Sequence, residues 1–237
     1  DAALTGFEFM TAESTQMVAH YLPDIARPFT KIIGSIEGRG DHVVSPSASV
    51  LIEISHSHTE EAAIQMLEEV MQLAMDQGLV TEAVVSQSHA QMASFWHLRE
   101  TITYAAAEDG VNIKHDIALP ISSIVEFIGA MDKEILENFP GVRLINFGHF
   151  GDGNLHYNIM IADHDPATIN TIVHDMVVKM GGSISAEHGI GQYRVEELAL
   201  RKSAQEMALS RRLKSALDPQ DLMNPGKVFV SRENPQA

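Results

Sequence analysis

Two short glycine-rich segments of this chain hold most of the residues that could do chemistry. They are NFGHFGDGNLHYNIM, residues 146–160, and SAEHGIGQYR, residues 185–194. The side chains in them that can bind a metal or move a proton are His149, His156, Asn158, Glu187 and His188. Two imidazoles and one carboxylate are the protein ligands of many catalytic zinc sites, where a further position stays open for water or substrate. We therefore predict that His149, His156 and Glu187 bind a divalent metal, with zinc as the expected ion.

An alternative interpretation needs no metal. The chain has 12 histidines, so two of them can fall close together by chance, and a turn between strands often carries a polar histidine. The glycines favour the metal interpretation, because Gly148, Gly151 and Gly153 would let the backbone turn sharply and approach a ligand without a Cβ in the way. A purely structural turn would not need so many glycines.

His188 is the expected general base. A metal bound by the neighbouring Glu187 would lower the pKa of the His188 imidazole and keep it neutral near pH 7, ready to accept a proton. An ordinary surface or capping histidine is the alternative. Asn158 lies two residues after His156 on an expected strand, so both side chains project from one face of the sheet.

Three further residues, Arg99, Thr103 and Lys114, are candidates for holding a substrate carboxylate. Arg99 and Thr103 are four residues apart on an expected helix and so share one face, and Lys114 begins the next expected strand. Arginine can bind a carboxylate through two parallel hydrogen bonds. The alternative for Arg99 is a solvated helix face with a surface ion pair to Glu100 or Glu108.

The composition restricts the class of protein. The 237 residues are 45% apolar, enough for a real core in one large domain or two small ones. With 16 Lys and Arg against 32 Asp and Glu, the formal charge is −16, which argues against binding to nucleic acid or to anionic membranes. The absence of cysteine excludes disulfides, thiolate metal sites and cysteine nucleophiles.

The sequence shows neither a run of about 18 apolar residues nor a signal sequence, so we expect no membrane span. We expect the protein in the bacterial cytoplasm, or in an organelle matrix if it is eukaryotic. The chain begins at Asp1, in what already looks like folded sequence. We therefore expect a fragment or a processed chain.

Apolar periodicity and turn residues predict alternating strands and helices. The expected strands cover residues 5–10, 49–55, 83–86, 113–119, 142–147 and 155–161. The expected helices cover residues 13–21, 59–77, 89–105, 120–140, 166–180 and 203–218, and residues 24–46 are expected to form a loop or a frayed hairpin. The last two strands are close enough in sequence to pair antiparallel. Short strands with helices packed on one side predict an α+β sandwich.

Three segments, HFGDGNLHYNI, SAEHGIGQYR and LDPQDLMNPGKVF, closely resemble the C-terminal domain of FAD-linked oxidases of the vanillyl-alcohol oxidase type. The resemblance covers about residues 49–229 and is nearest to the D-lactate and D-2-hydroxyglutarate dehydrogenases and the glycolate oxidase flavin subunit. It implies a ferredoxin-like α+β sandwich with an antiparallel sheet and a helical C-terminal extension. Residues 1–237 would then be a substrate-binding cap domain that lacks its N-terminal FAD-binding domain.

The resemblance also implies roles for single residues. It makes His149, His156 and Glu187 the metal ligands and His188 the general base. The residues implied to bind substrate are Arg99, Thr103, Lys114 and Asn158. Asn224 and Lys227, in a C-terminal helix and Asn-Pro-Gly-Lys segment over residues 203–229, are the implied FAD contacts.

The implied function is oxidation of a D-2-hydroxy acid to the 2-oxo acid by hydride transfer to FAD, with zinc holding the substrate. The substrate would be of the lactate, 2-hydroxyglutarate or glycolate type, and the domain alone would be inactive. The expected partners are the acid and the N-terminal FAD-binding domain of the same protein, with a homodimer left open. Two alternatives also remain open, namely a zinc-dependent hydrolase that uses the His-His-Glu site and a non-catalytic metal-binding domain.

Overall fold

A computed structural model describes residues 2–26, 48–162 and 166–229 of the chain. Most of the segment expected as a loop, residues 27–46, lies outside these ranges. The start of that segment is helical, because α2 covers Pro23–Ala26. Within the described residues, no helix is both long enough and apolar enough to cross a membrane.

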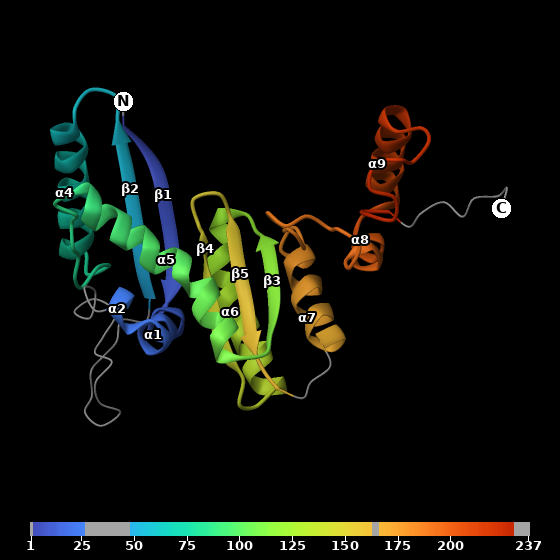
Figure 1. Cartoon of the computed structure of the whole chain (residues 1–237), viewed down its shortest axis with the longest axis horizontal. Coiled ribbons are helices and arrows are strands. Elements are labelled where there is room, and N and C mark those ends of the chain that lie inside the picture. Colours follow the sequence, from blue (N-terminus) through green and yellow to red (C-terminus); the bar gives the residue numbers. More distant parts are fainter. Residues whose placement is uncertain (1, 27–47, 163–165, 230–237) are drawn as a thin grey trace.

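The described strands form one five-stranded sheet in which every neighbouring pair is antiparallel, in the order β2-β1-β4-β5-β3 (Figure 1). The strands are β1 Ala2–Thr11, β2 Ala48–His56, β3 Asn112–Ala118, β4 Arg143–His149 and β5 Asn154–Met160. Five of the six predicted strands are therefore confirmed, including the antiparallel pair β4 and β5.

Helices connect the strands and extend beyond them. They are α1 Ala12–Tyr21, α4 Glu60–Asp76, α5 His89–Asp109, the 3-10 turn η2 Ile121–Ser123, α6 Ile124–Asn138, α7 Pro166–Lys179, α8 Val195–Arg201 and α9 Ala204–Leu217. Thr59 caps α4 by accepting from Ala62 N–H, and Ser203 with Glu206 forms a capping box at α9. The six predicted helices are confirmed, whereas α2 and α8 were not predicted.

Two hydrophobic cores lie on opposite faces of the sheet, so helices cover both faces and not one face as expected. On one face, α6 and α7 pack residues such as Phe127 and Val173 against Tyr157 of β5. On the other face, α1 and α5 pack Val18 and Ile102 against the sheet. The element order from β3 through α6, β4, β5 and α7 has the β-α-β-β-α pattern of ferredoxin-like folds. The α+β fold class is confirmed.

The prediction of a strand at residues 83–86 was wrong. These residues have no regular secondary structure, and Ala83 and Val84 are exposed to solvent. A short apolar run becomes a strand only when a neighbouring strand supplies hydrogen-bond partners, and the run by itself does not reveal whether one is available.

The methionines of α4 do not belong to either core. Met66 is 38% exposed and Met75 is 37% exposed, and α4 contains no buried residue. Figure 1 shows the reason, because α4 lies beside β2 at the end of the sheet, away from the two cores.

Candidate functional site

The strand register gathers polar side chains on the face of the sheet that α5 covers in part. The paired residues are Glu8 with His149, Phe147 with His156, Asp116 with His156, and Lys114 with Asn158. Because directly paired residues point to the same side of an antiparallel sheet, these side chains share one face. The register thus extends the expected neighbourhood of His156 and Asn158 to residues from β1 and β3.

The structure brings His149, His156 and Glu187 together. One possible ligand atom from each lies within 4.8 Å of the others. His149 Nε2 is 3.1 Å from Glu187 Oε1, and the His149 and His156 rings are 6.4 Å apart between centroids. Two imidazoles and a carboxylate at this spacing have the right chemistry and reach for one divalent ion. The residues therefore fit a zinc ion.

Glu8 contacts the Nδ1 side of the His149 ring. The Nδ1 atom of His149 lies 2.7 Å from the Glu8 carboxylate, so Nε2 points toward Glu187. This hydrogen bond raises the pKa of His149, although burial of the ring acts in the opposite direction. A carboxylate behind a metal-binding histidine sets its tautomer and its orientation. Glu8 therefore occupies Nδ1 of His149 and leaves Nε2 on the side of Glu187.

Arg99 lies behind Glu8 in the protein interior. Its Nε is 3.0 Å from Glu8 Oε2, and its guanidinium lies over the Phe147 ring at 4.8 Å from the centroid. Only 5% of Arg99 is exposed, so the alternative of a solvated helix face is wrong. Burial lowers the pKa of Arg99, and the charge of Glu8 opposes this effect. The Nη2 atom is buried and has no hydrogen-bond partner among the described residues.

His156 differs from His149 in its environment. Burial lowers its pKa to about 4, against the opposing charge of Asp116. The ring is therefore neutral at pH 7, and a neutral imidazole has the lone pair that a metal requires. This state agrees with the fit of the site to a cation.

The loop that carries Glu187 and His188 is attached to Asp116 of β3. One carboxylate oxygen of Asp116 accepts the N–H groups of Ala186, Glu187 and His188 at 3.3, 3.0 and 2.9 Å. The same oxygen lies 3.6 Å from His188 Nδ1. Burial alone would raise the pKa of Asp116, but the N–H group and the charge of His188, with the other donors, hold it below its usual range.

The other residues predicted to bind substrate are placed unequally. Lys114 is exposed and Asn158 is buried, and the two are paired across β3 and β5 on the site face. Thr103 is exposed on α5, one turn beyond the buried Arg99. Lys114 is therefore accessible on this face, whereas Arg99 is already paired with Glu8.

The two predicted FAD contacts lie in the C-terminal segment. Lys227 Nζ contacts Gln192 Oε1, and the N–H of Val228 donates to Gly191 O at 2.8 Å. Lys227 is thus brought to the end of the loop that contains His188. Asn224 lies in a turn with φ of 51°, and no contact of its side chain with the histidines is seen among the described residues.

The glycines of the HFGDGN turn have a structural function that the sequence analysis did not anticipate. A Cβ on Gly148 would lie 2.4 Å from Asn154 O, and a Cβ on Gly153 would lie 2.3 Å from Leu119 O. Gly153 also has a φ of +89°, which L side chains rarely adopt. These two glycines let backbone segments of the protein approach one another. They are therefore no evidence for an approaching ligand.

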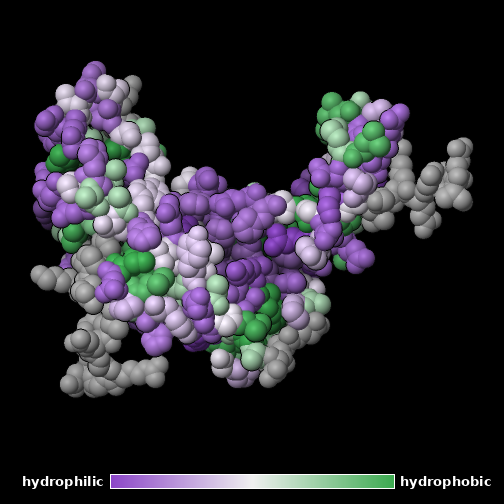
Figure 2. Space-filling model, in the orientation of Figure 1, coloured by the Kyte–Doolittle hydropathy of each residue, from purple (hydrophilic) through white to green (hydrophobic). Residues whose placement is uncertain are grey.

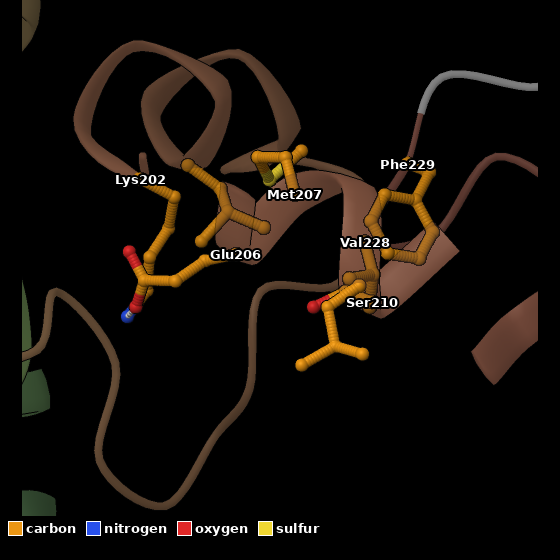
Figure 3. Close-up of a pocket in the computed structure, with 8 residues that line it drawn as sticks. Lys202, Glu206, Met207, Ser210, Val228 and Phe229 are labelled. Carbon is orange, nitrogen blue, oxygen red and sulfur yellow. Dashed lines mark hydrogen bonds and ion pairs between the residues drawn. The ribbon is translucent and has the colours of Figure 1, made fainter. Parts of the chain in front are cut away.

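A groove of about 190 Å³ lies beside α8 and α9 (Figure 3). Its lining residues are Leu198, Lys202, Glu206, Met207, Leu209, Ser210, Val228 and Phe229. The charged pair in this lining, Lys202 and Glu206, is joined at 3.1 Å. Figure 1 places α9 away from the strands that carry the histidines. The groove is thus separate from the candidate metal site.

Sequence reasoning missed Glu8 and Asp116. Each is a carboxylate within an apolar strand, in GFEFM and HDIAL, and each is at most 3% exposed. Buried carboxylates need strong partners, so their positions were an available signal. Their partners, His149 and the loop at residues 186–188, are far away in the sequence.

The chain is similar to known proteins over nearly all of its length. The family model described as FAD linked oxidases, C-terminal domain, matches residues 1–228. The chain is 33% identical over 229 residues to the mitochondrial D-2-hydroxyglutarate dehydrogenase of Arabidopsis thaliana. This match covers 95% of this chain and 38% of that protein. It is 35% identical over 214 residues to the D-2-hydroxyglutarate dehydrogenase of Stutzerimonas stutzeri (strain A1501), covering 85% of this chain and 45% of that protein. It therefore spans less than half the length of these relatives.

Proposed function

Because this chain belongs to the FAD-linked oxidase family and matches the C-terminal domain of that family, we propose that it is the substrate- and metal-binding part of an FAD-dependent D-2-hydroxy-acid dehydrogenase. The observation that carries the proposal is the meeting of His149 and His156, on one face of the sheet, with Glu187 and His188 of the following loop. The relatives are named for D-2-hydroxyglutarate, which we propose as the substrate.

In this proposal His149, His156 and Glu187 hold a zinc ion. When bound, zinc would act as a Lewis acid on the substrate's 2-hydroxyl and carboxylate, and FAD would accept the hydride from C2. The Glu8 carboxylate lies 2.7 Å from His149 Nδ1. This contact keeps His149 in the tautomer that has Nε2 free for the ion.

His188 accepts the proton of the substrate hydroxyl in the proposed reaction. Its ring lies 6.0 Å from the His156 ring between centroids, which places it beside the residues that would hold the ion. The side chain is 62% exposed and can pass the proton to water. Its Nδ1 faces Asp116, which leaves Nε2 as the atom that takes the proton.

Lys114 is the residue proposed to attract a substrate carboxylate first. It is exposed on the site face and paired with Asn158, and the carboxylates already on this face are Glu8, Asp116 and Glu187. A dicarboxylate such as 2-hydroxyglutarate needs cations to offset this local negative charge. Thr103 and Arg99 are proposed to complete the carboxylate site from α5.

The C-terminal segment is proposed to contact a FAD-binding domain through Asn224 and Lys227. The exposed leucines of α9 support this, because Leu209, Leu213 and Leu217 are 59%, 57% and 77% exposed and recur every four residues along one side. Figure 2 shows apolar residues gathered on this outlying helix. A contiguous apolar face usually marks a contact with another protein surface. A homodimer remains a prediction.

The test uses the full-length gene product supplied with FAD and zinc. We expect oxidation of D-2-hydroxyglutarate by the wild type, and a fall in kcat of about 10²- to 10⁴-fold in His188→Ala with FAD still bound. Zinc content should be about one ion per chain in the wild type and in the control His89→Ala, an exposed histidine at the start of α5, and should be lost in His149→Ala.

Three results would contradict the proposal. Near-normal turnover in His188→Ala would refute the assignment of the base. Metal-dependent ester or amide hydrolysis without flavin would favour a zinc hydrolase. Loss of folding on zinc removal, with no oxidation of any 2-hydroxy acid, would favour a structural metal site.

A further inference from the structure

Asp116 neither binds the metal nor takes a proton in the proposed reaction, yet its carboxylate contacts the loop that carries Glu187 and His188. It is 2% exposed, lies on β3, and is paired across the sheet with His156. A buried carboxylate is costly unless several donors compensate for its lost hydration. The donors that compensate here come from the loop that carries Glu187 and His188.

The path of the chain after α7 explains how this loop reaches Asp116. The backbone groups of Ala118 and Ser183 exchange two hydrogen bonds, of 3.0 and 2.8 Å, which place the chain alongside β3. The N–H of Ala186 then donates to Asp116 O at 3.1 Å. From this point the loop turns over the Asp116 side chain.

Three consecutive N–H groups, those of Ala186, Glu187 and His188, then converge on one oxygen of the Asp116 carboxylate. Successive backbone N–H groups that point to one spot form an anion-binding nest. Here the anion is part of the protein, and hydrogen bonds to a charged acceptor are about twice as strong as those between neutral groups. The second carboxylate oxygen lies 3.4 Å from Asn154 Nδ2, which limits rotation of the carboxylate.

We propose that Asp116 is a positioning residue that fixes the backbone of residues 186–188, so that the Glu187 carboxylate reaches the metal and the His188 ring faces the substrate. The inference rests on the proposed function for what Glu187 and His188 do there. Asp116 also lies 3.6 Å from His188 Nδ1, so it orients the His188 ring as well as the backbone.

A competing role for Asp116 is that of a metal ligand. Asp116, Glu187 and His188 form a second group whose possible ligand atoms lie within 4.8 Å of one another. The oxygen nearest to His188 already accepts three N–H groups, and a cation placed there would face those donors. The geometry therefore favours the positioning role.

The experiment compares Asp116→Asn and Asp116→Ala with the control Asp132→Asn in the full-length gene product. Asp132 is a matched control, because it accepts hydrogen bonds from Tyr157 and Asn146 at 2.8 and 3.3 Å on the opposite face of the sheet. The measurements are hydrogen exchange in the peptide that contains residues 186–188, zinc affinity by competition with a chelator, and steady-state kinetics.

In Asp116→Asn we expect faster exchange at residues 186–188, and a loss of about 10- to 100-fold in zinc affinity and in kcat, as for other residues that orient metal ligands. KM should change little, and Asp132→Asn should change none of the three. Asp116→Asn decides the outcome if Asp116→Ala does not fold.

Two results would overturn the proposal. In one, exchange at residues 186–188 in Asp116→Asn equals that of the wild type. In the other, the wild type binds two metal ions per chain and Asp116→Asn binds one, which would make Asp116 a metal ligand. A wild type without bound zinc would refute the proposed function but not the positioning role, which faster exchange together with a lower kcat would still support.

Discussion

At the scale of single residues, the candidate site depends on a buried ion pair. Glu8 and Arg99 have side chains that are 4% and 6% exposed, and the same carboxylate holds His149. Taking two charges out of water is costly, so the loss of one partner leaves the other uncompensated in the interior. The orientation of His149 is therefore linked to the stability of the region where α5 packs on β1.

Glu8→Gln keeps the size of the side chain and removes its charge. We expect the free energy of unfolding to fall by about 3 kcal/mol, because the Arg99 charge stays buried without its counterion. The double variant Glu8→Gln/Arg99→Met should regain much of this loss. Urea denaturation of the wild type, Glu8→Gln, Arg99→Met and the double variant forms a double-mutant cycle, which measures the coupling free energy between Glu8 and Arg99.

An exposed ion pair offers the control for this cycle. Glu13 and Arg143 lie 3.3 Å apart with side chains 39% and 47% exposed, and Glu13→Gln should cost less than about 1 kcal/mol. If Glu8→Gln costs no more than Glu13→Gln, or if the double variant is less stable than both single variants, the account of the buried pair is wrong.

At the scale of elements, α8 determines where the chain goes after the loop that carries Glu187 and His188. With seven residues, Val195–Arg201 is too short to be stable alone. It is attached to α7 by polar contacts of Glu197 with His174 Nδ1 at 2.6 Å and of Arg201 with Asp175 at 2.8 Å. Burial lowers the pKa of His174, with Glu197 acting in the opposite direction.

Glu197→Ala should release α8 from α7. Because Glu197 contacts both His174 and Arg201, we expect local opening of residues 195–201 to become easier by about 1–3 kcal/mol, seen as faster hydrogen exchange there. The neighbouring Glu196 is exposed, and Glu196→Ala is the control. Equal exchange in the two variants would show that these contacts do not hold α8.

At the scale of the whole molecule, His115 links folding to pH. It is 1% exposed between β3 and α7, with Nδ1 2.9 Å from Tyr157 O and Nε2 2.9 Å from Asn170 Oδ1. Burial lowers its pKa from 6.5 to about 4. The unfolded chain therefore binds a proton at this residue at a higher pH than the folded chain does.

The sign of the effect follows from this difference. Between pH 6.5 and about 4 the unfolded state binds more protons, so stability falls as the pH falls, by about 3 kcal/mol at most from His115. Above pH 6.5 His115 contributes no pH dependence. The measurement is the free energy of unfolding in urea at several pH values, for the metal-free wild type and for metal-free His115→Gln. The wild type should lose more stability toward pH 4 than the variant, and parallel curves would contradict this account.

The sequence by itself determined the local structure of this protein and the kinds of chemistry open to it. Apolar periodicity and capping residues such as Thr59 and Ser203 located the six predicted helices and five of the strands, because these signals act between residues close in the chain. The residue types in the two glycine-rich segments were sufficient to indicate a possible His-His-Glu site.

Only the tertiary structure decided which residues meet. Glu8 and His149 are 141 residues apart and become partners through the register of β1 and β4, and Asp116 reaches the loop at residues 186–188 through the bridge at Ser183. The same dependence explains the failed strand at residues 83–86. Strand pairing and buried charge pairs depend on contacts between distant segments, and such contacts are set by the packing of the whole chain.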